Sequence, residues 1–192
     1  MLKKSKKFAL NFKILRFFLI PTVLVSTALF SNIQDVRAGL EFQWQQNDGF
    51  RRLKWFQKEN KRRFRNKIYF FLRPSDRTAD LLKINLAIPS TFKSTLKNEK
   101  ISFCKVKIGG FETRTKCLED VPADIEISTD ESGLRSLDIY PYSPIPSNKE
   151  SYAILLKVFN PTKTGLYQFH SYGQPKRKTS SSYLGSWTIV ID

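Results

Sequence analysis

Regular alternation of apolar and polar residues is the feature that most limits how this chain can fold. The segment Leu82–Ile88 carries apolar side chains at every second position, and the same period recurs in Asp124–Ile127 and Trp187–Ile191. Successive side chains of a β-strand point to opposite faces of its sheet. The pattern therefore predicts strands with one face in a core and the other face in water.

Two further runs, Ile68–Leu72 and Tyr152–Phe159, are apolar at almost every position. Such runs are typical of central strands that are covered on both faces. Additional strands are expected at Ile101–Ile108, Glu112–Cys117, Leu134–Tyr140 and Gly165–Tyr172. Within the first of these, the apolar parity changes between Phe103 and Cys104, which predicts a β-bulge there.

The segments between these runs are rich in turn-forming residues, for example Gly109-Gly110 and Asn160-Pro161. Short strands separated in this way favour an all-β fold, an antiparallel β-sandwich of about eight to nine strands. Only Leu53–Phe64 and Thr91–Asn98 have any potential to be helical. We place the sandwich domain at 68–192, after a basic segment that contains aromatic residues at 39–67.

The N-terminus has the features of a cleaved signal peptide, which we place at 1–38. Four lysines within the first seven residues precede Phe17–Phe30, an uncharged and mostly apolar run of 14 residues. A membrane-spanning helix needs about 20 such residues. The small residues of Val36-Arg37-Ala38 predict cleavage between Ala38 and Gly39. We therefore expect export to the periplasm, the cell surface or the medium, with a mature domain that does not span the membrane. An uncleaved anchor is the alternative.

Two cysteines, Cys104 and Cys117, are expected to form a disulfide, because oxidising compartments outside the cytoplasm preserve such bonds. Two buried thiols are the alternative. A metal site is not expected, since the chain has one histidine and no second cysteine pair. The acidic tract Glu119–Glu131 does not have the spacing of a calcium loop. The sequence implies no cofactor.

Positive charge is the main indication of function. The formal net charge is +16, and the leader contributes seven cations and one anion, so +10 remains after cleavage. The segment 51–67 holds nine cations against Glu59 alone, with aromatic residues between them. Basic residues interleaved with aromatics can bind a polyanion by charge and by stacking. The candidate residues are Arg51, Arg52, Lys54, Trp55, Lys58, Lys61, Arg62, Arg63, Arg65 and Lys67.

Outside the cytoplasm the expected partners of this segment are anionic lipid headgroups, acidic polysaccharide or an envelope protein, and nucleic acid is not expected. A solvated basic stretch, anchored to the sandwich by its aromatics, is the alternative. No catalytic residue is assigned, because neither Ser171 nor Ser186 lies in a nucleophile turn near the single His170. We expect a non-catalytic binding or structural module. The alternative is an envelope hydrolase acting on polysaccharide or peptide.

A set of short motifs follows the same order along the chain. They are RFRNKIYFFLRP at 63–74, KINLAIP at 83–89, IYPYSPIP at 139–146, Asn160-Pro161 with GLYQF at 165–169, and LGSW at 184–187. In these motifs the chain, from about Leu40 to Asp192, resembles a cyanobacterial family of exported proteins known as domain of unknown function 2808. The resemblance implies an exported, β-rich domain with no established activity, and it supplies no catalytic residues.

Overall fold

The computed structural model describes residues 49–110, 112–147 and 149–192. The predicted signal peptide and its cleavage site, Ala38–Gly39, lie outside the described residues. Within the described part of the chain, no helix is long and apolar enough to cross a bilayer.

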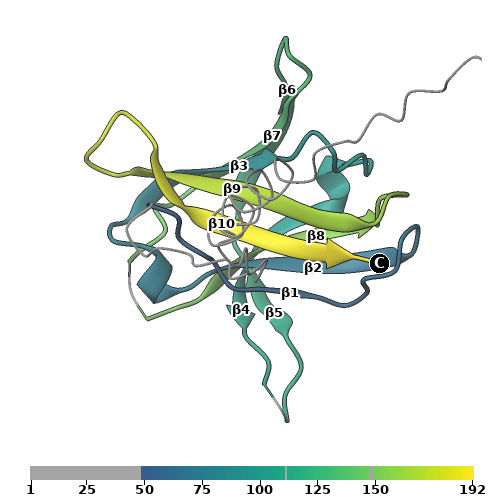
Figure 1. Ribbon diagram of the computed structural model, residues 1–192. Coiled ribbons are helices and arrows are strands. Elements are labelled where there is room, and N and C mark those ends of the chain that lie inside the picture. The colour runs from purple at the N-terminus through teal and green to yellow at the C-terminus, as the bar shows by residue number, and fades with distance from the viewer. Residues whose placement is uncertain (1–48, 111, 148) are drawn as a thin grey trace, which may run out of the picture. The chain divides into compact units, whose positions relative to one another are not determined.

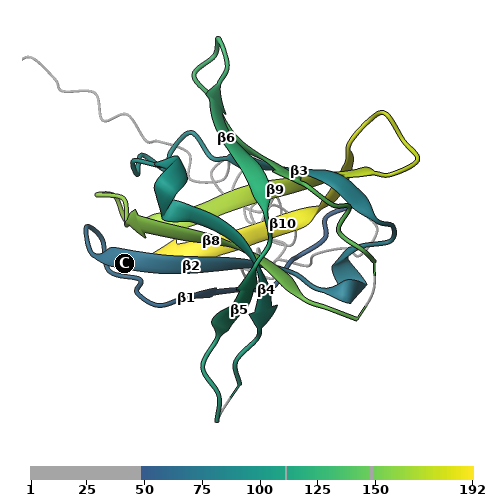
Figure 2. The same cartoon turned by 180° about the vertical axis from the view of Figure 1, so that it is seen from behind.

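Ten strands form two antiparallel sheets of five strands each, which confirms the predicted β-sandwich (Figures 1 and 2). The first sheet has the order β1 (Trp55–Gln57), β2 (Arg65–Leu72), β8 (Tyr152–Phe159), β4 (Ile101–Lys107) and β5 (Lys116–Asp120). The second has the order β10 (Ser182–Ile191), β9 (Gly165–Pro175), β3 (Leu81–Ile88), β7 (Arg135–Pro141) and β6 (Ala123–Thr129). Two short 3₁₀ turns, η1 (Pro74–Asp76) and η2 (Asn98–Lys100), complete the described structure.

The main core lies between the two sheets and contains most of the alternating residues that the sequence indicated, except that a register shift at the start of β3 buries Leu81 in place of Leu82. In β3, the side chains of Ile84, Leu86 and Ile88 are buried, while their neighbours on the strand are half-exposed. An aromatic cluster links the sheets at the centre. The ring of Phe70 lies 4.8 Å from that of Phe169 and 4.9 Å from that of Trp187, between centroids. Burial of such large rings is a main source of core stability.

Strands β2 and β8 are buried on both faces, as their continuous apolar runs predicted, and β4 is buried on both faces as well. Their inward residues belong to the main core, whereas a second buried cluster lies on the outward face of the sheet. This second cluster consists of Tyr69, Phe71, Cys104, Val106, Ala153 and Leu155. Phe103 and Cys104 are successive apolar residues because β4 is buried on both faces. They do not form a bulge, since the pairing of β4 with β8 continues without interruption through both residues. The expected bulge is instead found between Lys105 and Val106, where β4 pairs with β5.

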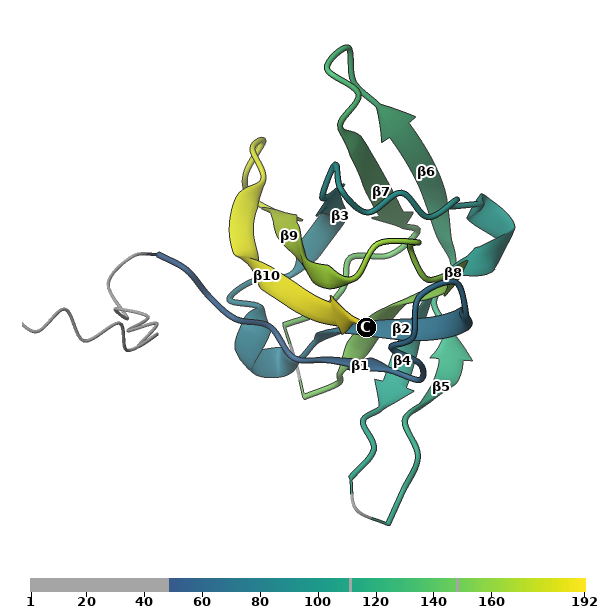
Figure 3. The ribbon, with the colours of Figure 1, turned by 45° about the vertical axis from the view of Figure 1, so that its right-hand side comes forward.

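One segment connects the edges of both sheets. The backbone of Leu53 donates a hydrogen bond to the carbonyl of Ser186 on β10 (2.8 Å), and β1 then pairs with β2 in the other sheet (Figure 3). The indole Nε1 of Trp187, on β10, donates to the carbonyl of Lys54 in this segment (3.0 Å) and to the carbonyl of Phe71 on β2 (3.2 Å). These bonds connect the segment and the two sheets. The sandwich therefore begins within the range 39–67, and Leu53–Phe64 contains a strand and a turn but no helix.

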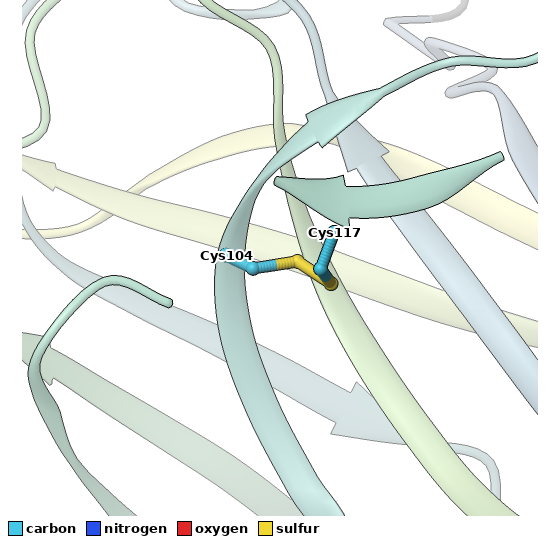
Figure 4. Close-up of a disulfide and its surroundings, with 2 residues drawn as sticks. All are labelled: Cys104 and Cys117. Carbon is cyan, nitrogen blue, oxygen red and sulfur yellow. A yellow bond between two sulfur atoms is a disulfide. The ribbon is translucent and has the colours of Figure 1, made fainter. Parts of the chain in front are cut away.

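The predicted disulfide between Cys104 and Cys117 is confirmed (Figure 4). It joins neighbouring strands β4 and β5 across a separation of 13 residues, with the two Cα atoms 5.7 Å apart. Since β5 is an edge strand, the bond anchors the hairpin that extends from this side of the sandwich (Figures 1 and 2).

Candidate anion-binding site

A pocket of about 550 Å³ lies on the outward face of the first sheet, where β1 and β8 end and β2 begins. We call it the lysine pocket. It is lined by six cations, namely Lys58, Arg65, Lys67, Lys97, Lys100 and Lys157, together with Glu59, Asn66, Thr95, Val158 and Phe159. Glu59 is the one carboxylate among these lining residues. The pocket therefore has a strong excess of positive charge.

Strand register places four of these lysines in one row across the sheet. Lys67 on β2 lies directly opposite Lys157 on β8. On one side of this pair, Lys58 donates its backbone N–H to the carbonyl of Lys67 at 3.1 Å. On the other side, Lys100 precedes Ile101, the first residue of β4 to pair with β8. Like charges that face each other across strands destabilise a sheet.

The lysines of this row form no ion pair within the described part of the chain. The ion pairs of the described residues involve other cations, none of them in the lysine pocket. Glu59 is already engaged, because its Oε1 accepts the backbone N–H groups of Asn60 and Lys61, each at 3.0 Å. The ammonium groups of the row therefore have no carboxylate within ion-pair distance among the described residues.

An exposed aromatic ring adds a second kind of contact. Phe159 is 56% exposed, although it is large and apolar. Arg65 lies opposite it in the register, and the guanidinium Cζ is 5.4 Å from the ring centroid. This distance is within the range of a cation–π interaction. The pocket therefore offers a flat apolar surface beside its charges.

Two buried asparagines position the basic turn between β1 and β2. Asn66 Nδ2 donates to Asn160 Oδ1 at 2.9 Å. In turn, Asn160 Nδ2 donates to the backbone carbonyls of Glu59 (3.2 Å) and Lys61 (2.8 Å). Both asparagines are at least 96% buried, so the hydrogen bond between their amides is protected from water. The amide pair therefore holds the turn against the end of β8 and sets the position of Lys58.

The ten candidate residues from the sequence do not form one surface. Three of them, Lys58, Arg65 and Lys67, line the lysine pocket. Three more occupy the adjoining turn, namely Lys61, Arg62 and Arg63, and Arg63 adopts a left-handed backbone with φ of 63°. The remaining four, Arg51, Arg52, Lys54 and Trp55, lie in the segment that joins the two sheets. Within that segment, Trp55 packs partly buried against the main core, and Arg51 approaches Asp76 at 3.8 Å.

Sequence reasoning missed three of the pocket cations, Lys97, Lys100 and Lys157. Only Lys157 had a detectable signal, since it is the one charged residue within the run Tyr152–Phe159. The two others lie at least 30 residues from the basic segment, before β4, and the pairing of β4 with β8 brings their part of the chain to the pocket.

A second group of polar side chains surrounds Ser186 on β10. Its Oγ lies 2.7 Å from His170 Nδ1 and 2.5 Å from the hydroxyl of Tyr183. The sequence did not predict this serine–histidine contact, because it depends on the register of β9 with β10. Ser186 is wholly buried, and its backbone takes part in strand pairing on both sides. A nucleophile must reach its substrate, so this arrangement fits an internal hydrogen-bond network better than a catalytic centre.

Within residues 49–192 as described, no three His, Cys, Asp or Glu side chains gather closely enough to hold a metal ion. The carboxylates of the acidic tract, such as Glu126 on β6, are exposed along edge strands.

Comparison with solved structures finds several distant likenesses. A bacterial hydrophobin, BslA, has 15% identity and a TM-score of 0.45, covering 73% of this chain and 97% of its own. The collagen-binding domain of a Staphylococcus aureus adhesin has 13% identity and a TM-score of 0.35, covering 66% and 87%. ACE19, the collagen-binding subdomain of the Enterococcus faecalis surface protein ACE, has 11% identity and a TM-score of 0.38, covering 71% and 95%.

No curated protein matches the sequence. A family model, by contrast, matches residues 44–191, which include every described strand. The match confirms the resemblance seen in the ordered motifs of the sequence. The chain belongs to the family described as "Protein of unknown function (DUF2808)".

Proposed function

We propose that this protein is a non-catalytic module outside the cytoplasm that binds an anionic component of the cell envelope in the lysine pocket. The observation that carries the proposal is the row of Lys58, Lys67, Lys157 and Lys100 across adjacent strands. Facing lysines cost stability when they are left unneutralised. A bound anion offsets that repulsion, so the arrangement favours a binding site over a surface selected only for stability.

The disulfide supports the location. Structural disulfides persist in oxidising compartments outside the cytoplasm, and Cys104–Cys117 joins two strands of the fold itself. The predicted signal peptide supports export by an independent route. In such a compartment, anionic lipid and acidic polysaccharide are the abundant polyanions, whereas nucleic acid is not expected.

The test compares two double variants that remove the same charge from different places. Lys67→Gln with Lys157→Gln removes the central pair of the row. Arg177→Gln with Lys178→Gln removes two exposed cations from the β9–β10 loop, which contributes nothing to the pocket. Binding to phosphatidylglycerol vesicles and to polygalacturonate is measured across a salt series, with thermal unfolding as the control for folding.

We expect the pocket variant to lose about 0.4–2 kcal/mol of binding free energy, because each exposed ion pair contributes about 0.2–1 kcal/mol. That loss corresponds to a roughly 2- to 30-fold higher Kd. The loop variant should stay close to wild type, and wild-type binding should weaken as salt rises. Equal losses in both variants would mean that net charge alone drives the binding, which would refute a specific site.

An envelope hydrolase is the second candidate, and the contact between Ser186 and His170 is the observation in its favour. The burial of Ser186 counts against it. Hydrolysis of nitrophenyl esters and glycosides by wild type and by Ser186→Ala decides the matter. Turnover that disappears in the variant, with folding intact, would support the hydrolase. Equal rates in both proteins would remove this serine as a nucleophile.

A further inference from the structure

A second hollow adjoins the lysine pocket on the outward face of the first sheet. It has a volume of about 750 Å³ and shares Lys58 and Lys67 with the lysine pocket. Its other lining residues are Phe56, Tyr69, Gly109, Gly110, Thr113, Arg114 and Thr115. The two hollows adjoin, since Lys58 and Lys67 line both, and we call the pair of hollows the sheet groove. Its lining comes from the end of β8 on one side, from β1 and β2 in the middle, and from the β4–β5 hairpin on the other side.

We propose that the sheet groove binds a linear acidic polysaccharide that occupies both hollows at once. The inference rests on the proposed function and deepens it, since it names the class of ligand. A single lipid headgroup or a free phosphate would fill one hollow and leave the other empty. A polymer with an anionic group on each sugar uses the whole length of the groove.

The distribution of side chains along the groove matches such a polymer. From Arg65 to Tyr69, β2 advances by about 13 Å. Exposed rings stand at both ends, with Phe159 56% exposed at one and Phe56 41% exposed at the other. Between them lies the facing pair of Lys67 and Lys157. Acidic sugars present carboxylates at their edges and apolar C–H groups on their faces, so charges and rings can contact the same chain in alternation.

The far wall of the groove is held in place by backbone contacts of the hairpin. Gly109 N–H donates to Thr115 Oγ1, and Gly110 N–H donates to the carbonyl of Thr113, each at 3.0 Å. A Cβ added at Gly109 would lie 2.5 Å from that carbonyl oxygen, so this close approach requires glycine. The disulfide anchors the same hairpin at its base. A wall formed before binding lowers the ordering cost of the complex.

The experiment separates the two ends of the groove. Phe56→Ala with Arg114→Gln alters only the far hollow, and Lys157→Gln alters only the lysine pocket. Calorimetry measures the binding of each protein to a galacturonate disaccharide and to the octasaccharide. Uncharged cello-oligosaccharides of the same lengths and phosphatidylglycerol vesicles are the comparison ligands. Thermal unfolding confirms that each variant is folded.

We expect wild type to bind the octasaccharide about 10-fold or more tightly than the disaccharide, because the second contact becomes intramolecular. The far variant should lose most of that gain and keep disaccharide binding, whereas Lys157→Gln should weaken both. If the far variant binds the octasaccharide as wild type does, while Lys157→Gln weakens this binding, the proposal that the polymer occupies both hollows is refuted. Binding in the lysine pocket is then still supported. If neither variant alters any binding, the proposed function fails as well. Tighter binding to vesicles or to the uncharged oligomers would also overturn the polysaccharide assignment.

Discussion

The Cys104–Cys117 bond allows a quantitative test of how the edge hairpin is held. Its separation of 13 residues closes a short loop. In the chain-entropy model, a loop of this size stabilises the folded state by about 3 kcal/mol, because it restricts the unfolded chain. For a domain of roughly 150 residues, that loss corresponds to a melting temperature about 6–12 °C lower. The perturbation is the double variant Cys104→Ala with Cys117→Ala.

Urea unfolding, followed by tryptophan fluorescence, measures the change. A loss of about 3 kcal/mol should lower the urea midpoint by about 1–3 M, given the usual range of slopes. Reductant should produce a similar shift in wild type and none in the double variant. The variant should also lose affinity for the octasaccharide more than for the disaccharide, because the anchored hairpin forms only the far wall of the sheet groove.

Two results would refute this reasoning. Identical urea midpoints for oxidised and reduced wild type would show that the bond does not stabilise the fold. A shift of equal size in the double variant would show that reductant acts elsewhere. Thiol titration and mass spectrometry of the purified protein provide the control, since wild type should contain no free cysteine.

Four further substitutions test other parts of the fold. Gly185→Ala should lower the free energy of unfolding by about 2–6 kcal/mol, since the φ angle of Gly185 is +147° and the new Cβ would lie 2.7 Å from the carbonyl oxygen of Arg51. Gly133→Ala, with φ of +81° and open space around it, should cost only about 1–2 kcal/mol in the same urea assay. Asn160→Ala should lower the free energy of unfolding by about 1–3 kcal/mol for each buried hydrogen-bond partner that it leaves unsatisfied. The same variant should also bind the oligosaccharide more weakly. Hydrogen bonds from the backbone N–H of Ser147, and to a smaller extent from its side chain, lower the pKa of Asp80. The ionised Asp80 therefore stabilises the fold above pH 3.8, and this stabilisation is lost as the pH falls through the pKa of Asp80 in the folded protein. Asp80→Asn should therefore lose less stability than wild type between pH 5 and pH 2, and NMR titration of wild type should give Asp80 a pKa below 3.8.

Local patterns in the sequence were sufficient to predict the class of fold and the covalent bond. Alternation in Leu82–Ile88 and the two-sided apolar runs of β2 and β8 depend only on which face each residue presents, a property of the strand itself. The pairing of Cys104 with Cys117 followed from the compartment and from two neighbouring strands. The ordered motifs were likewise sufficient for the family, and the matched family model covers them.

The candidate site could be predicted only in part, because it depends on contacts between distant segments. Lys58, Arg65 and Lys67 belong to the basic segment, but Lys157 reaches the pocket only through the pairing of β8 with β2. Composition could locate positive charge along the chain, yet it could not show which charges face one another. The basic segment is itself divided among the pocket, the adjoining turn and the stretch that joins the two sheets. Its residues 51–53 form backbone hydrogen bonds with β10, whereas β1 pairs with β2 in the other sheet.

The sequence by itself therefore determined that this chain forms strands, that those strands bury a two-sided core, and that its cysteines pair. These properties follow from side-chain periodicity and local chemistry. Only the tertiary structure decided that Lys67 faces Lys157, that two hollows adjoin at Lys58 and Lys67, and that Ser186 contacts His170. Register between strands far apart in sequence is set by the packing of the whole core, and no local pattern specifies it.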